Sequence, residues 1–189
     1  MKADRKALMA LVAVLAGVCA VHAAPAKKPA SVKWPGGQVS ADGQIGFKTR
    51  GGKVLLNFAK NVRATAQGAG QSVELHHADQ ATAEVDSKWQ FDTLKATGNV
   101  RFTISRKNGE QLEKTTARCN QVMIYNRFAQ ELTGDQRVLI AELSGGVHLT
   151  MPAPKAAGAT MEPMTLEGEH GQVWRTAEGY EGTISAQGD

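Results

Sequence analysis

Alternation of apolar and polar residues is the feature that most constrains how this chain can fold. It is clearest in Val54–Val62, Val100–Ser105 and Val147–Met151. Successive side chains of an extended strand point to opposite faces, so a period of two predicts strands with one buried face. From Gln38 onward, no window of a dozen residues keeps a helical period of 3.6, and we therefore expect an all-β chain.

The same segments carry a short repeat, which indicates a modular sheet. Lys60-Asn61-Val62-Arg63, Gly98-Asn99-Val100-Arg101 and Gly145-Gly146-Val147-His148 each place a turn-forming pair before valine and a basic residue after it. We expect these pairs, like Gly51-Gly52 and Asn108-Gly109, to be turns between strands. Repeated units stack so that each completes the apolar face of its neighbour. A jelly roll, an elongated sandwich and a β-solenoid all fit this pattern.

Composition limits the hydrophobic core to a thin one. Residues 24–189 contain 31 Leu, Ile, Val and Phe among 166 residues, close to the share below which chains are often disordered. The formal charge of +4 falls to +2 over these residues, because 19 basic residues face 17 acidic ones. A nearly neutral chain is not expanded by its own charge, so we expect one folded domain. The same arithmetic argues against a multilayer enzyme with a large buried core.

The N-terminus is typical of an export signal. Met1–Lys6 is short and basic, and Ala7–Val21 is an apolar run of 15 residues, too short to span a bilayer comfortably. Val21-His22-Ala23 supplies the small residues of a cleavage site. We expect a signal peptide over residues 1–23, cleaved after Ala23, with an uncleaved anchor as the alternative.

Two stretches of low complexity lie beyond the signal peptide. Residues 24–37 are rich in Pro, Ala and Lys and are expected to form an extended leader. The single β domain then covers residues 38–189, with a flexible loop at 151–164, where three prolines oppose a helix. Cleavage leaves Cys119 as the only cysteine, so no internal disulfide forms, and we expect this residue at a half-buried strand position.

Candidate catalytic and ligand-binding motifs are weak. His77 and Asp79 would share one face of a strand, but no further metal ligands follow at a recognisable spacing. Gly70-Gln71-Ser72 lacks the glycines of a nucleophile elbow, and Gly68-Ala69-Gly70 lacks the lysine of a phosphate-binding loop. We therefore predict no catalysis, no metal, no cofactor and no nucleic-acid partner. A secreted hydrolase of cell-wall polymer is the enzyme alternative, without a motif to support it.

The apolar strand faces give the candidate binding surface. If the alternating residues all point inward, they line one aliphatic surface, which is either simply a core or also a shelter for an acyl chain. The residues of this inner face are Val54, Leu56, Phe58, Val62, Val100, Phe102, Ile104, Val147 and Leu149. Arg63, Arg101 and His148 follow the repeated valines and form a basic row or rim if the strands stack. Such a row suits an anionic partner such as a lipid phosphate, or is solvated cross-strand charge.

Short motifs also recur in two successive units between residues 50 and 151. The first unit contains Ala78-Asp79, Val85-Asp86 and Leu94–Val100, and the second contains Asn120, Tyr125-Asn126 and Leu143–Val147. With the export signal and the β pattern, they resemble the lipopolysaccharide-transport periplasmic family, also called the organic-solvent-tolerance or OstA-like family. Asn120 departs from the pattern, since Asp is usual there.

This resemblance implies a half-open, twisted β-jellyroll, or β-taco, of repeated antiparallel strands. It implies a periplasmic protein of outer-membrane biogenesis whose inner face shelters acyl chains of lipopolysaccharide or a related envelope lipid. It also implies that homologous domains stack through their edge strands to form a bridge between membranes. We therefore expect an exported, non-catalytic lipid carrier or bridge component. The alternative is an envelope interaction module or filament that stacks through its edges without lipid cargo.

Overall fold

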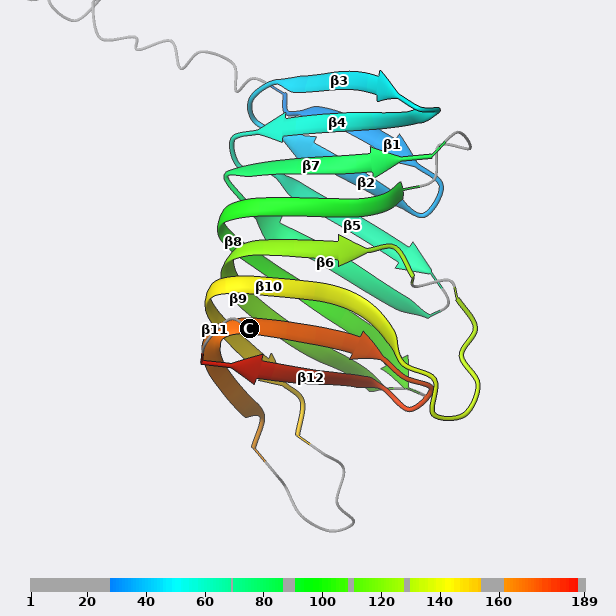
Figure 1. Ribbon diagram of the computed structural model, residues 1–189, viewed down its shortest axis with the longest axis vertical. Helices are drawn as coiled ribbons and strands as arrows, with labels where there is room; N and C mark the ends of the chain where they lie inside the picture. Colours follow the sequence, from blue (N-terminus) through cyan, green and yellow to red (C-terminus); the bar gives the residue numbers. More distant parts are fainter. Residues whose placement is uncertain are drawn as a thin grey trace, which may run out of the picture.

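The computed structural model describes residues 28–68, 70–86, 91–108, 111–127, 130–153 and 162–186. Twelve β-strands in these residues form one open sheet, and every strand pair is antiparallel (Figure 1). The all-β prediction is confirmed. Within these residues, no helix has the length and apolar character needed to cross a membrane. The expected signal peptide, residues 1–23, lies outside the described part of the chain.

The strands vary from short hairpin arms to long ribbons. They are β1 (Ala30–Trp34), β2 (Gly37–Ala41), β3 (Ile45–Arg50), β4 (Lys53–Ala59), β5 (Arg63–Gly68), β6 (Gln71–His77), β7 (Gln80–Val85), β8 (Phe91–Asn108), β9 (Gln111–Tyr125), β10 (Val138–Met151), β11 (Met164–Arg175) and β12 (Tyr180–Ser185). The four strands from β8 to β11 are the longest, and the shape of the sheet depends on them.

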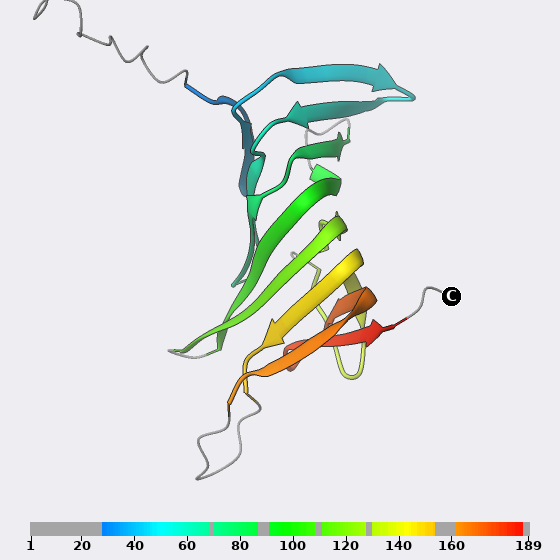
Figure 2. The same ribbon diagram turned by 90° about the vertical axis from the view of Figure 1, so that its left-hand side faces the viewer.

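The sheet is bent so that its two halves face each other. We call β3, β4, β7 and β12 layer A, and β1, β2, β5 and β6 layer B; the strands from β8 to β11 pass through both layers. The first part of β8 pairs with β7, and its second part pairs with β6. In Figure 1 the bend runs down the left-hand side, and Figure 2 shows the long strands crossing from one layer to the other. We call the opening between the strand ends opposite the bend the mouth.

The bend lies at the three sequence repeats. Lys60 and Asn61 have φ of 68° and 48°, Gly98 and Asn99 have 78° and 48°, and the third pair, 145–146, has 78° and 62°. The pair 98–99 opposes a single residue of β9, and the pair 145–146 opposes a single residue of β11. The prediction that these two pairs are turns between strands is therefore wrong. They are β-bulges, whose extra residue bends a continuing strand.

Close packing explains glycine at the first position of two of these pairs. A Cβ at Gly98 would lie 2.7 Å from Asp79 Cβ, and one at Gly145 would lie 2.8 Å from Asn120 Cβ. A Cβ at Gly146 would meet nothing within 4 Å, so this position is constrained only by its positive φ. Asparagine tolerates that conformation, which explains why Asn99 takes the equivalent place in β8.

A single apolar core fills the space between the two layers. The valines after the bend, Val62, Val100 and Val147, are at most 1% exposed. Many of the other inward residues are alanines, among them Ala83 and Ala96, so the facing layers can approach closely. All buried apolar side chains of the described residues form one cluster. The thin core expected from composition is thus distributed along one continuous inner face.

The predicted leader and the predicted loop can be compared with the strand boundaries. The leader predicted over residues 24–37 is shorter, because Ala30–Trp34 form β1 and pair with β2. Val32 and Trp34 pack on the core from this strand. The loop predicted at 151–164 falls between β10, which ends at Met151, and β11, which begins at Met164, and residues 154–161 of it lie outside the described part of the chain.

The third bulge offers a graded test of this bend. We expect Gly146→Asn to change the free energy of unfolding by less than about 0.5 kcal/mol, because Asn61 and Asn99 occupy the same position. Gly146→Ala should lower it by about 1–2 kcal/mol through the left-handed backbone alone. Gly145→Ala should lower it further, because its Cβ also meets Asn120. Urea unfolding measures all three, and equal losses for both alanine variants would contradict the packing argument.

Candidate functional site

The nine predicted inner-face residues lie on the facing walls of one interior. Val54, Leu56 and Phe58 lie on β4 in layer A, and the other six lie at or after the bend in layer B. Val54 is half-buried, and the remaining eight are at most 5% exposed. The residues are thus brought together as a packed core.

A small cavity lies between the layers toward β1. Its lining includes Trp34, Val39 and Leu75 from layer B, and Phe91, Leu94 and Ile124 from the facing wall. None of the nine predicted residues lines it. Its volume is only about 10 Å³, roughly the space that one water molecule needs. An acyl chain could therefore enter only if the two layers moved apart.

Side chains, not backbone ladders, close the mouth between the layers. The rings of Trp34 and Phe91 stack with centroids 5.5 Å apart and planes at 25°. The Tyr180 hydroxyl donates to Gln71 Oε1 at 2.5 Å, farther along the mouth. No strand pair among the described residues joins the layers there. The layers are therefore continuous at the bend and held by side-chain contacts at the mouth.

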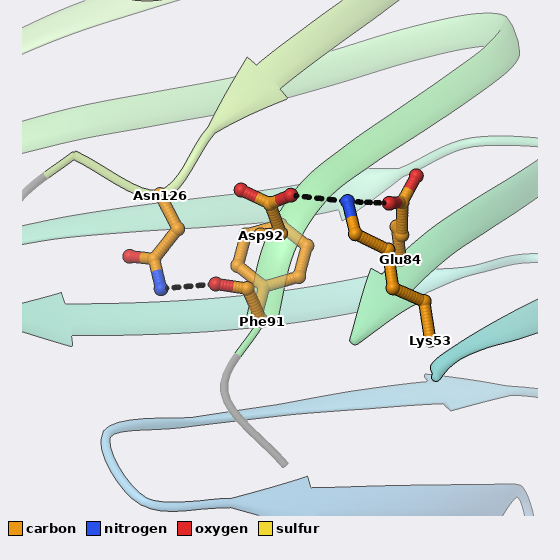
Figure 3. A network of polar contacts seen from close by, with 5 residues as sticks. All are labelled: Lys53, Glu84, Phe91, Asp92 and Asn126. Atoms are coloured by element: carbon orange, nitrogen blue, oxygen red, sulfur yellow. Dashed lines mark hydrogen bonds and ion pairs between the residues drawn. The ribbon is translucent and has the colours of Figure 1, made fainter. Parts of the chain in front are cut away.

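A polar network fixes the start of β8 and with it the Phe91 ring (Figure 3). Lys53 on β4 forms ion pairs with Glu84 and with Asp92, the latter at 3.3 Å. The hydrogen bond to Glu84, followed by the one to Asp92, raises the pKa of Lys53. Asn126 Nδ2 donates to the Phe91 carbonyl at 2.6 Å and so anchors the backbone at the start of β8.

Two arginines lie at the β12 end of the mouth. Arg175 is 7% exposed, and burial lowers the pKa of its guanidinium. Arg106 Nη2, from layer B, donates to the Ala177 carbonyl in the β11–β12 turn at 2.7 Å. Tyr180 lies beside both guanidinium groups, and burial raises the pKa of its hydroxyl. These charged groups border the apolar interior. Because they are far apart in the sequence, the sequence alone does not predict that they lie close together.

The predicted basic residues occupy a different place. Arg63, Arg101 and His148 are exposed on the outer face of layer B, immediately after the bend. Arg63 Nη2 lies 2.9 Å from Asp42 Oδ1, and His148 Nδ1 lies 3.0 Å from Glu167 Oε1. The three residues therefore face away from the interior and do not border the mouth.

His77 and Asp79 are neighbours in a hydrogen-bonded chain along the bend. His77 Nε2 lies 3.4 Å from Asp79 Oδ1, and its Nδ1 lies 2.9 Å from Asn61 Oδ1. Asn61 Nδ2 in turn donates to Asp42 Oδ2 at 2.8 Å. Across the described residues, no three His, Cys, Asp or Glu side chains gather as a metal site would require. These contacts connect the strands at the bend.

Cys119 lies on β9 beside the bend and is more buried than expected. Its side chain is 5% exposed, against a prediction of a half-buried position. Burial raises the pKa of the thiol from 9.0 to about 11, because the thiolate would be poorly solvated there. The nucleophilic thiolate is therefore scarce at neutral pH.

Thiol reactivity tests this environment. In a Cys19→Ala chain, we expect Cys119 to react with a soluble disulfide reagent much more slowly at pH 8 than an added outer-face cysteine, Thr116→Cys. In urea the two thiols should react alike. Because burial raises the pKa of the Cys119 thiol, the thiol ionises more readily in the unfolded chain than in the folded one. The stability of the folded state is therefore unaffected by this thiol below pH 9 and falls as the pH rises from 9 toward 11. Equal rates in the native protein would contradict the buried position.

Comparison with known proteins gives no relative. The chain matches no protein-family model, no curated protein and no solved structure. Its function must therefore be argued from the bent sheet, its apolar interior and its mouth.

Proposed function

We propose that the protein is an exported periplasmic lipid carrier or bridge component. Acyl chains of lipopolysaccharide or a related envelope lipid lie on the apolar inner face between the two layers. In this proposal the bent sheet is a half-open, twisted β-jellyroll, or β-taco, as the OstA-like motifs imply. The work is binding and transfer, without a catalytic group.

The observation that carries the proposal is the unequal closure of the interior. At the bend the layers share continuous strands, whereas at the mouth the contacts between the described residues of the two layers each involve a side chain. Separating the layers at the mouth therefore leaves the backbone ladders of the sheet intact. The protein can expose its inner face without unfolding.

The energies involved allow contacts between the two layers to be replaced by contacts with a lipid. A hydrogen bond or an aromatic pair contributes roughly 0.5–1.5 kcal/mol, so the three mouth contacts together oppose opening by only a few kcal/mol. Separation also exposes the apolar walls, but an acyl chain between them covers these surfaces again. Each methylene moved from water to an apolar site contributes about 0.8 kcal/mol. A long acyl chain can thus offset the cost of opening.

The two ends of the interior are consistent with stacking of homologous β domains. Phe47 on the edge strand β3 is 77% exposed, although its cross-strand partner Leu56 is buried in the core. Met164 on β11 is 47% exposed at the other end. Edge strands can pair with a further domain through their free backbone groups. Such pairing would extend the apolar interior from one domain into the next.

The second candidate is a non-catalytic envelope interaction or filament module without lipid cargo. The nearly filled interior favours it, because about 10 Å³ holds no part of an acyl chain while the layers are in contact. Both candidates use the exposed edges. They differ in whether lipid ever reaches the inner face.

Site-specific photocrosslinking separates the two candidates. A photoreactive residue at Phe102 or Leu149 should form adducts with lipopolysaccharide in cells, because both side chains point into the interior. The same residue at Thr103 or Thr150, on the outer face of the same strands, should not. Absence of adducts at both inner positions, in protein that folds and self-associates, would reject the carrier in favour of the module.

The two tyrosines allow a matched test of the mouth. Tyr180→Phe removes the hydrogen bond to Gln71 across the mouth but keeps the ring. We expect loading of a fluorescent acyl chain to become about fivefold faster, which corresponds to roughly 1 kcal/mol. Tyr125→Phe removes a similar bond to Glu142 within layer A and should leave loading unchanged. Identical rates for both variants would contradict opening at the mouth.

A further inference from the structure

We propose that Arg101 and Arg118 form a binding site for a phosphate-type oxyanion on the outer face of layer B. The site lies beside the bend and away from the mouth, so it does not depend on lipid in the interior. Arg101 belongs to one of the three sequence repeats, whereas Arg118 lies outside them.

The strand register places four nitrogen-bearing side chains in one row. His77 is the cross-strand partner of Arg101, which is the partner of Arg118, which is the partner of His148. The row therefore crosses the adjacent strands β6, β8, β9 and β10. Neighbouring strands lie about 4.8 Å apart, so two opposed guanidinium groups can contact the same tetrahedral anion.

Among the described residues, only the two ends of this row form ion pairs with carboxylates. Asp79 lies 3.4 Å from His77, and Glu167 lies 3.0 Å from His148. Two carboxylates also lie beside the row, since Asp79 Oδ2 accepts from Asn99 Nδ2 at 3.3 Å and Glu169 Oε2 accepts from the Gly146 N–H at 3.4 Å. Within the described residues, neither Arg101 nor Arg118 forms an ion pair or a side-chain hydrogen bond. Like charges directly opposite each other destabilise a sheet. A bound anion would replace this repulsion with two charge-assisted contacts.

The surface is also hollowed at this point. The polar part of its lining comes from His77, Asn99, Arg101, Arg118, Asn120 and the backbone of Gly146, and the buried Val100 and Cys119 also border it. The bulges at Asn99 and Gly146 interrupt the regular ladder around it. Planar guanidinium groups match the oxygen geometry of phosphate and bind it through paired N–H donors. The two guanidinium charges, the strand register and the hollow thus all favour the binding of one oxyanion at this place.

Inorganic phosphate is the first probe, with chloride at the same ionic strength as the reference. We expect phosphate to raise the melting temperature of the wild-type protein, because a ligand that binds only the folded state stabilises it. Arg118→Gln should lose this increase and should melt higher than wild type in chloride, since the repulsion is gone. Arg101→Gln is a second variant with the same expectation.

Lys114→Gln provides the control. Lys114 is exposed on the same face of β9, four residues from Arg118, and opposes the neutral Ser105. This variant loses the same charge and should keep the full response to phosphate. A full response in both arginine variants, or an equal loss in Lys114→Gln, would overturn the proposal in favour of general charge attraction.

Vesicles distinguish lipid phosphate from free phosphate. Sedimentation with vesicles of phosphatidylglycerol and phosphatidylcholine, lost in Arg118→Gln and kept in Lys114→Gln, would assign the site to phosphorylated head groups. A response to inorganic phosphate without vesicle binding would assign it to soluble phosphate. No response to either probe would overturn the site, whereas crosslinking from Phe102 would still report on the interior separately.

Discussion

Pairs of residues in the left-handed backbone region are the constraint on which this structure depends. At Gly98-Asn99 and Gly145-Gly146 they insert one extra residue into a strand, and the sheet turns back on itself without ending. Because the backbone ladders continue on both sides, the two layers share β8 to β11. The inner face, the outer row of charges and the mouth are all positioned by this bend.

The bend divides the molecule into regions of different resistance to opening. Near it, strands are joined through hydrogen bonds that include Asp79 N–H to the Thr97 carbonyl at 3.0 Å. At the mouth, the layers meet through the stacked rings of Trp34 and Phe91 and a few polar contacts. A thin core rich in alanine allows this close approach. This difference between the two sides is what the proposed lipid carrier would need in order to open.

Much of the fold could be predicted from the sequence, but the role of its repeats could not. Alternation correctly indicated strands around Val54, Val100 and Val147, because a pleated strand exposes alternate residues. A pair such as Gly145-Gly146 predicts a two-residue turn as readily as a bulge, and in the structure the strand continues through it. The alternation of Ala30–Trp34 was present but hidden by flanking Pro and Lys. Register between distant strands, which pairs Arg101 with Arg118, has no signature in a single sequence.

Strand β8 is the point where two branches of the sheet meet, and this has a consequence for the order of folding. Along one edge it receives β7 on its first part and β6 on its second, while the other edge pairs with β9 throughout. The strands that precede β8 can therefore pair within the two branches β1-β2-β5-β6 and β3-β4-β7, but in the described part of the chain strand pairing unites these branches only through β8. Strand β8 is thus the strand whose pairing turns two separate branches into one bent sheet.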